Sequence, residues 1–198
     1  NGDDIHQQTA RKIFDIPADQ PVPAQMRRAA KTVNFSIIYG ISSFGLAAQL
    51  GVSRPEAQNI INSYMAGLPE IRDYIEKTKK FAIENGCVYT PWGRKIELPE
   101  ARNPRMRAYA MRAAINAPIQ GFEADLMRRA MIEINNKIIQ PNKDKIRMIM
   151  QVHDEIILEC ADEFAENFAK QIKSEMEHIT KLSVPLVAEY AINHFWDK

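Results

Sequence analysis

Two adjacent carboxylates, Asp154 and Glu155, are the residues of this sequence that most directly suggest chemistry. They lie near the centre of 146–160, between two apolar runs rich in strand-favouring residues, and this segment contains no Gly or Pro. The pattern predicts a hairpin of two buried strands joined by a tight connection. Carboxylates at the tip of a buried hairpin are unfavourable without a positive partner, so we expect a divalent metal ion there. The alternative is a polar turn that faces water.

A second group of residues recurs at every fourth position: Arg27, Lys31, Phe35 and Tyr39. On a helix this spacing places the four side chains in one stripe, with two cations at one end and two aromatic rings at the other. Cations neutralise phosphates, and aromatic faces stack on bases at roughly 1–3 kcal/mol each, so the stripe matches a nucleoside triphosphate. The alternative is a basic surface face whose two aromatic rings pack inward.

A third group, Arg112, Asn116 and Gln120, also recurs at intervals of four. A guanidinium and two amides on one side of a helix suit hydrogen bonds to sugars, phosphates and the minor-groove edges of base pairs. Four arginines between positions 101 and 112 make this part of the chain basic, which favours a local anionic partner. The alternative is a polar face that only contacts water.

Helices and a hairpin must position these groups, and the sequence predicts both. The helix that would carry the stripe runs from about Ala24 to Tyr39. It stops at Gly40, because glycine is favoured at the position just after a helix. The fold class is α+β, mostly helical in the first half, with helices and a small antiparallel sheet in the second. Helices are predicted at 4–14, 24–39, 53–67, 69–86, 105–117, 122–139 and around 164–176, with an interruption at Pro118, and strands at 87–90, 95–98, within 146–160 and at 184–191.

Composition and spacing exclude several common sites. Gly40 and Gly45 have the spacing of a phosphate-binding loop, but the Lys and Ser or Thr that such a loop needs do not follow. The four histidines lack zinc-ligand spacing, and Cys87 and Cys160 are too far apart for a Cys-x-x-Cys site. No apolar run approaches the ~18–20 residues that span a bilayer, so we expect no membrane partner. Both cysteines lie beside apolar residues, which is typical of buried free thiols in a reducing cytosol, so we expect a cytoplasmic location.

Two segments resemble motifs of one protein family. Arg-Arg-Ala-Ala-Lys-Thr-Val-Asn-Phe-Ser-Ile-Ile-Tyr-Gly at 27–40 resembles motif B, on the fingers helix of family A DNA polymerases, the bacterial DNA polymerase I group. Gln-Val-His-Asp-Glu at 151–155 resembles motif C, in the palm of the same family. Residues 4–10 and 112–121 are similar to the segments around these motifs. The order also agrees, and the likeness covers essentially the whole chain.

The resemblance implies that five residues bind the incoming deoxynucleoside triphosphate. Arg27 and Lys31 would grip the triphosphate and offset the charge that builds on it, with help from His6 on a neighbouring helix. Phe35 would lie against the sugar and base, and Tyr39 would guard the template side of the new base pair. Closure of the helix over a correct pair would supply induced fit.

The resemblance also implies a metal site and a DNA site. Asp154 would bind the catalytic metals, two Mg²⁺ ions in the complete enzyme, with Glu155 close by, and these ions would promote nucleotidyl transfer. A further set of residues would contact the primer end or the minor groove of the duplex: Arg112, Asn116, Gln120 and His153.

By the same resemblance, residues 1–100 would form the helical fingers subdomain and 101–198 the C-terminal part of an antiparallel-sheet palm with packed helices. The expected partners are DNA primer–template, deoxynucleoside triphosphates and the remaining N-terminal part of the polymerase.

One part of the family pattern is absent from the sequence. Family A polymerases have a second metal-binding Asp in a strand motif, Asp-Tyr-Ser-x-Ile-Glu, a few tens of residues before the segment that starts here at Asp4. We therefore expect this motif upstream of Asn1 and expect the chain alone to be catalytically incomplete. Glu123 and Asp125 lie on a predicted helix and are no substitute. The alternatives are a non-catalytic module that binds nucleotide or primer–template, and a metal-dependent hydrolase, which would need a second ligand cluster.

Overall fold

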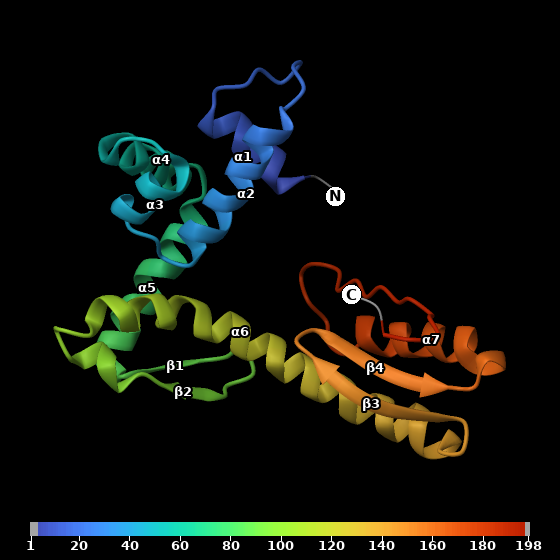
Figure 1. Cartoon of the computed structure of the whole chain (residues 1–198). Helices are drawn as coiled ribbons and strands as arrows, with labels where there is room; N and C mark the ends of the chain where they lie inside the picture. The colour runs from blue at the N-terminus through green and yellow to red at the C-terminus, as the bar shows by residue number, and fades with distance from the viewer. Residues whose placement is uncertain (1–3, 197–198) are drawn as a thin grey trace. The chain divides into compact units, whose positions relative to one another are not determined.

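The computed structural model describes residues 4–196, and the chain divides into two compact units, Asn1–Ile119 and Gln120–Lys198 (Figure 1). The division falls inside the long helix α6 (Arg107–Ile134). The functional boundary predicted between residues 100 and 101 concerns the roles of the two parts and stays a prediction.

Five helices begin the first unit, and each starts or ends where the sequence supplies a suitable residue. Asp4 caps the first helix, because its Oδ1 accepts hydrogen bonds from the backbone N–H groups of His6 and Gln7. Gly40, with φ of 72°, follows the second helix in a conformation that favours glycine. The helices are α1 (Ile5–Ile13), α2 (Ala24–Ile38), α3 (Ser43–Leu50), α4 (Arg54–Gly67) and α5 (Pro69–Asn85).

These bounds confirm the predicted helices at 4–14, 24–39, 53–67 and 69–86. Helix α3 was not predicted, although Ser42 caps it by accepting a hydrogen bond from the N–H of Gly45. A hydrophobic core holds α2, α3 and α4 together and includes Val33, Ile37, Leu46, Ala57 and Tyr64.

A second core in this unit lies around a short hairpin and the start of α6. Strands β1 (Cys87–Tyr89) and β2 (Lys95–Glu97) are antiparallel, and Val88 lies opposite Ile96. A 3₁₀ turn, η1 (Pro99–Arg102), follows. The core residues are Ala82, Val88, Leu98, Ala101, Ala110, Met111 and Ala114. The hairpin predicted at 87–98 is therefore confirmed.

The interruption predicted at Pro118 is wrong, because α6 continues through it. Proline has no N–H, so it cannot donate to the carbonyl of Ala114 four residues earlier. Next to Ala114 on α6, the carbonyl of Ile115 accepts a hydrogen bond of 2.9 Å from the Tyr74 hydroxyl on α5. Pro118 is itself buried. Helix α6 is thus bonded to α5 one residue away from the carbonyl that Pro118 leaves without its usual helical donor.

The second unit packs helices against one antiparallel hairpin, as Figure 1 shows for α7. After α6 come a π-helical turn, η2 (Asn135–Ile139), and a 3₁₀ turn, η3 (Gln140–Asn142). Strands β3 (Ile146–Val152) and β4 (Glu155–Cys160) and helix α7 (Asp162–Glu177) follow. The core combines residues of α6, η2, β3 and α7 with Ile179, which follows α7: Ala130, Ile134, Ile138, Ile139, Ile146, Phe168, Ile172 and Ile179.

Two predictions about the strands of this unit are wrong. The hairpin at 146–160 exists, but its strands are not buried, since Ile149 and Met150 are 52% and 39% exposed. The segment 184–191 is not a strand, and no strand of the described residues pairs with it. A run of apolar residues predicts strand-forming tendency, but burial and pairing depend on neighbours that the run does not specify. Within 4–196, no helix has both the length and the apolarity needed to cross a membrane.

Candidate functional site

The stripe on α2 faces outward in the first unit. The opposite face of the helix packs into the unit through Ala30, Val33 and Ile37. On the stripe, Phe35 is 49% exposed and Tyr39 is 47% exposed. The alternative in which both rings pack inward is therefore wrong for this structure. Two cations and two aromatic rings are available to a ligand along one side of α2.

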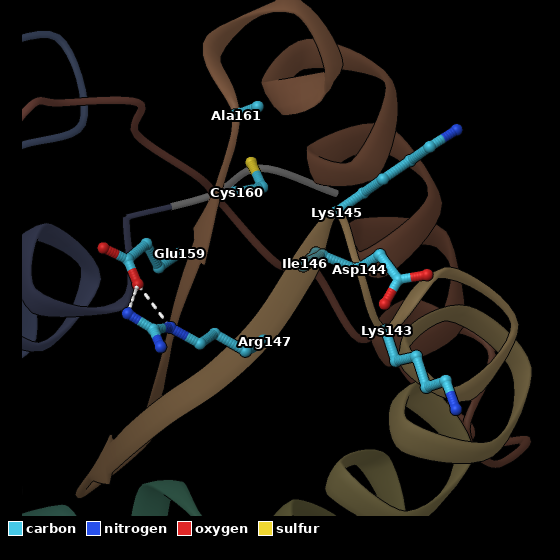
Figure 2. Close-up of a pocket in the computed structure, with 8 residues that line it drawn as sticks. All are labelled: Lys143, Asp144, Lys145, Ile146, Arg147, Glu159, Cys160 and Ala161. Carbon is cyan, nitrogen blue, oxygen red and sulfur yellow. Dashed lines mark hydrogen bonds and ion pairs between the residues drawn. The ribbon is translucent and has the colours of Figure 1, made fainter.

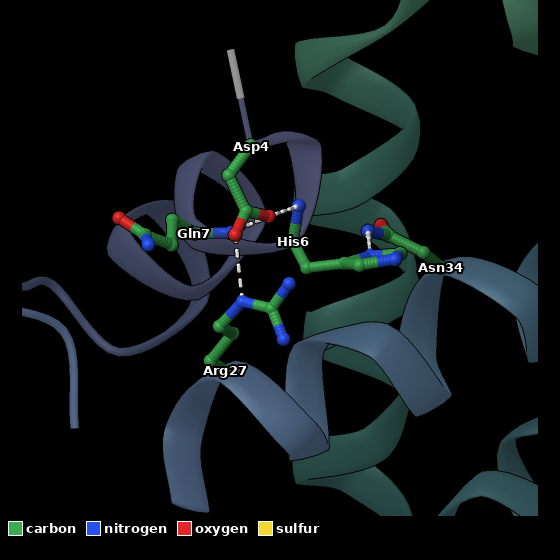
Figure 3. Close-up of polar contacts among 5 residues, drawn as sticks. All are labelled: Asp4, His6, Gln7, Arg27 and Asn34. Carbon is green, nitrogen blue, oxygen red and sulfur yellow. Dashed lines mark hydrogen bonds and ion pairs between the residues drawn. The ribbon is translucent and has the colours of Figure 1, made fainter. Parts of the chain in front are cut away.

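Arg27, at the start of the stripe, is held by the capping residue of α1 (Figure 3). Its Nε donates to Oδ2 of Asp4 at 2.6 Å, while Oδ1 of Asp4 caps the helix. The hydrogen bond from Arg27 holds the pKa of the Asp4 carboxyl below its ordinary value of 3.8, and the backbone N–H groups of Gln7 and His6 add to this. The terminal nitrogens of Arg27 point away from Asp4 and have no acceptor among the described residues. They remain able to bind an anion, while Nε fixes the guanidinium.

His6 reaches the same side of α2 from the first turn of α1. Its Nδ1 lies 2.9 Å from Nδ2 of Asn34, and its ring centroid lies 6.0 Å from that of Phe35, at an angle of 41°. The structure thus places His6 beside Phe35, and Asp4 contacts both Arg27 and the backbone of His6. Lys31 is exposed between them along the helix, and no residue in the described part of the chain pairs with it.

The three polar residues predicted to contact DNA all lie within α6. Arg112 is exposed, and its side-chain stem lies against Gly40, after the end of α2. The side-chain amide of Asn116 donates a hydrogen bond of 2.9 Å to the backbone carbonyl of Arg112, one turn earlier in the same helix. Gln120 is exposed and begins the second unit. Arg112 and Asn116 are therefore close together in the first unit, whereas Gln120 belongs to the second.

The carboxylate pair of the second unit lies at the tip of the β3–β4 hairpin. Val152 pairs with Glu155, so His153 and Asp154 form a two-residue turn. His153 has φ of 52°, a conformation that costs a non-glycine residue about 1–2 kcal/mol. Gln151 supports the turn by donating its side-chain amide to the carbonyl of His153. A bulky residue held in such a conformation suggests a functional constraint on its direction.

Asp154 and Glu155 are both exposed, and the carboxylate of neither has a hydrogen-bonding or ionic partner among residues 4–196. Unpaired carboxylate oxygens suit a hard cation such as Mg²⁺, which takes about six oxygen ligands. No group of three or more His, Cys, Asp or Glu side chains within the described residues could hold a metal by itself. The turn therefore fits part of a metal site, and further ligands are needed to complete it.

A cavity of about 430 Å³ in the second unit does not coincide with the turn. Its lining comes from the opposite end of the hairpin, where β3 begins and β4 ends. Figure 2 shows Lys143 and Lys145 pointing away from the ion pair between Arg147 and Glu159. Arg147 and Glu159 neutralise each other and the two lysines point away from them, so these charged groups do not form a catalytic cluster.

Two contacts at the α1–α2 site were not predicted. Asp4, which caps α1, also binds Arg27, and the sequence did not predict this ion pair. Asn34 was not singled out, although it is 4% exposed and receives a hydrogen bond of 2.9 Å from the hydroxyl of Thr9. The sequence could have indicated the burial of Asn34, because this polar residue lies on the same helix face as the apolar residues Ala30, Val33 and Ile37.

Comparisons with known proteins identify the family. A family model described as DNA polymerase family A matches residues 1–198. The chain is 45% identical over 205 residues to DNA polymerase I of Rhizobium leguminosarum and 43% identical over 197 residues to DNA polymerase I of Pseudomonas aeruginosa. These matches cover 100% and 98% of the chain. The chain belongs to DNA polymerase family A, as the motifs predict.

A solved structure agrees with this assignment. It is the POL domain of Pol1 from M. smegmatis in complex with DNA primer-template and dNTP. The TM-score is 0.83 at 34% sequence identity, and the match covers 93% of this chain and 33% of that chain. The predicted α+β fold class is confirmed. The chain spans 20% and 21% of the lengths of the two bacterial relatives.

Proposed function

We propose that the chain supplies the fingers, residues 1–100, and the C-terminal part of the palm, residues 101–198, to a DNA-directed DNA polymerase. Such an enzyme extends a primer on a template by nucleotidyl transfer. The observation that carries the proposal is the exposed stripe on α2, with His6 beside it, in a chain of family A. The similar POL domain in complex with primer-template and dNTP supports the same substrates.

In this proposal the α1–α2 site binds the incoming deoxynucleoside triphosphate. Lys31 and the terminal nitrogens of Arg27 neutralise the phosphates, because neither has another acceptor among the described residues. The exposed rings of Phe35 and Tyr39 offer flat apolar faces to the sugar and bases. His6 adds a hydrogen bond to the triphosphate. The order of charges and rings along α2 sets the direction in which the nucleotide lies.

DNA contacts are proposed for four exposed or half-exposed polar residues: Arg112, Asn116, Gln120 and His153. Arg112 is held by its stem against Gly40, so its guanidinium has a defined position from which to reach a phosphate or a base edge. The strained backbone of His153 directs its imidazole from the turn. The primer end and the minor groove are the proposed targets.

Asp154 is the proposed ligand of the catalytic metals, two Mg²⁺ ions, and Glu155 lies next to it. When bound, such ions make the primer hydroxyl more acidic and neutralise the phosphates. The remaining ligands come from outside the turn, and a second Asp upstream of this chain is the proposed source. The N-terminal remainder of the polymerase is thus a proposed partner, and the cytoplasm is the proposed location.

Nuclear magnetic resonance titration of the ¹⁵N-labelled chain with dATP tests the nucleotide site, because it detects weak binding and locates it. We expect shifts in the first turn of α1 and along the α2 stripe. Lys31→Ala should weaken binding about tenfold, as expected for loss of a charge-assisted hydrogen bond. Arg28→Ala is the matched control, since Arg28 is also an exposed cation on α2 but lies off the stripe.

Equal losses for the two variants, or shifts confined to other residues, would contradict the nucleotide site. A non-catalytic module that binds nucleotide or primer–template is the second candidate, since the unpaired stripe would serve it equally well. In a complete polymerase that carries this chain, Asp154→Asn separates the two. It should abolish incorporation and leave primer–template binding intact, whereas a binding module would show no incorporation to lose.

A further inference from the structure

A buried chain of hydrogen bonds connects Thr9, Asn34 and His6 (Figure 3 shows the last two). The Thr9 hydroxyl donates to Oδ1 of Asn34 at 2.9 Å, and Nδ2 of Asn34 lies 2.9 Å from Nδ1 of His6. Thr9 and Asn34 are 7% and 4% exposed, although both are polar. Asn is a weak helix former, and burying its amide is costly unless the amide is hydrogen-bonded. The presence of a buried Asn at position 34 of α2 therefore requires an explanation.

The arrangement of donors and acceptors provides one. Because the Asn34 oxygen accepts from Thr9, the amide NH₂ group faces His6. An NH₂ group can only donate, so Nδ1 of His6 must accept. In a neutral imidazole one ring nitrogen accepts and the other carries the proton, so the proton of His6 lies on Nε2. With its amide in this orientation, Asn34 determines which side of the ring is the donor.

We infer that Asn34 is a positioning residue, which holds His6 as the Nε2–H form so that its imidazole donates to a phosphate oxygen of the incoming nucleotide. The inference rests on the proposed function of the α1–α2 site. His6 is half-buried, and its ring lies near Phe35 on the same side of α2 as Lys31. Asn34 itself is buried beneath this side and acts through His6, while Thr9 keeps the Asn34 amide in the required orientation.

The tautomer of His6 can be measured directly on the 198-residue chain. Long-range ¹H–¹⁵N correlation spectra of chain labelled at histidine distinguish the two neutral forms, and His6→Gln identifies the His6 signals. We expect the Nε2–H form in the unchanged chain. In Asn34→Asp the carboxylate can only accept, so Nδ1 should carry a proton instead. An Nδ1–H form in the unchanged chain would overturn the inference, and this result depends on no variant.

Binding of dATP gives the second readout. Asn34→Leu introduces an apolar side chain of similar size that cannot donate to Nδ1, and it should weaken dATP binding roughly five- to tenfold. In the His6→Gln background the same substitution should have little effect. An equal loss in both backgrounds would show that Asn34 acts through the packing of α2 and would contradict a positioning role.

Two further measurements separate this inference from the proposed function. Thr9→Val removes the hydroxyl without changing the size of the side chain, and it should leave His6 as a mixture of tautomers. Deoxyadenosine, which lacks phosphates, should bind the chain and Asn34→Leu equally. If the unchanged chain binds no dATP while its His6 is the Nε2–H form, the nucleotide site fails. If dATP binds and His6 has the other form, only the role of Asn34 fails.

Discussion

The Cγ atom of Arg112 lies 3.1 Å from the position that a Cβ atom would occupy on Gly40. The backbone after the end of α2 thus rests directly on the stem of a residue in α6, within the first unit. Gly40 also has φ of 72°, so two separate constraints require glycine at this position. This contact connects the helix of the nucleotide stripe with the helix of the proposed DNA contacts.

Gly40→Ala should destabilise the first unit by about 1–2 kcal/mol from the backbone conformation alone, with an additional cost from the contact with Arg112. Gly51→Ala is the matched control, because Gly51 has φ of 69° and no atom within 4 Å of the built Cβ. Urea unfolding, followed by Trp92 fluorescence in a Trp196→Phe background, measures both. Arg112→Ala should reduce the excess cost at Gly40. Equal costs for the two glycine variants would show that the contact contributes nothing.

Tyr74→Phe should destabilise the first unit by about 1 kcal/mol, because it removes the hydroxyl that donates to the carbonyl of Ile115. In a Pro118→Ala background the backbone N–H at 118 is restored, and the cost of Tyr74→Phe should be smaller. The same fluorescence assay measures this double-mutant cycle. An unchanged cost in the alanine background would mean that the tyrosine does not compensate for the proline.

The ion pair between Asp4 and Arg27 should make the stability of the α1–α2 contact depend on pH. The pKa of Asp4 lies below 3.8 in the folded chain, so its stabilising contribution is complete above that value and is lost as pH falls through the folded pKa. Asp4→Asn retains a good helix cap but removes the charge. The difference in unfolding free energy between the unchanged chain and Asp4→Asn should shrink as pH falls from 6 to 3.

Arg27→Gln is the control for this pH effect. It removes the partner of Asp4, so Asp4→Asn should have little additional effect in its background. A difference between the unchanged chain and Asp4→Asn that stays constant with pH would contradict the assignment of the pKa shift to Arg27.

His153→Gly should stabilise the β3–β4 hairpin by about 1 kcal/mol, since glycine adopts a positive φ without the cost paid by histidine. Hydrogen exchange of the β3 and β4 amides at fixed pH measures the local stability. Asp154→Gly should give no such gain, because φ at Asp154 is not positive. Faster exchange in His153→Gly would show that interactions of the imidazole outweigh the backbone strain.

The 198-residue chain alone should not extend a primer in the presence of Mg²⁺, because no group of three or more His, Cys, Asp or Glu side chains among the described residues could hold a metal ion. The proposed site at Asp154 and Glu155 therefore needs further ligands. The assay measures incorporation of dATP opposite a template thymine, with a complete family A polymerase as the positive control. Templated incorporation by the chain alone would contradict the requirement for an upstream Asp. Filter binding of primer–template at several salt concentrations should still give a steep salt dependence if the DNA contacts are correct.

The local sequence was sufficient to predict most of the helices. Caps such as Asp4 and Ser53, and the glycines that follow α2 and α5, act within one helical turn, so their effects can be recognised without knowing the fold. The spacing of Arg27, Lys31, Phe35 and Tyr39 likewise requires only a helix to become a stripe. The family could be identified for a similar reason, because its motifs are continuous segments of the chain.

Only the tertiary structure decided the features that depend on residues distant in sequence. Helix α6 continues through Pro118 and is bonded to Tyr74 on α5, Asp4 binds Arg27, and Asn34 lies between Thr9 and His6. The exposure of the β3–β4 hairpin and the absence of strand structure at 184–191 also depend on which neighbours are present. Propensity and periodicity are properties of a segment, whereas burial, pairing and hydrogen-bond partners are properties of the contacts between segments.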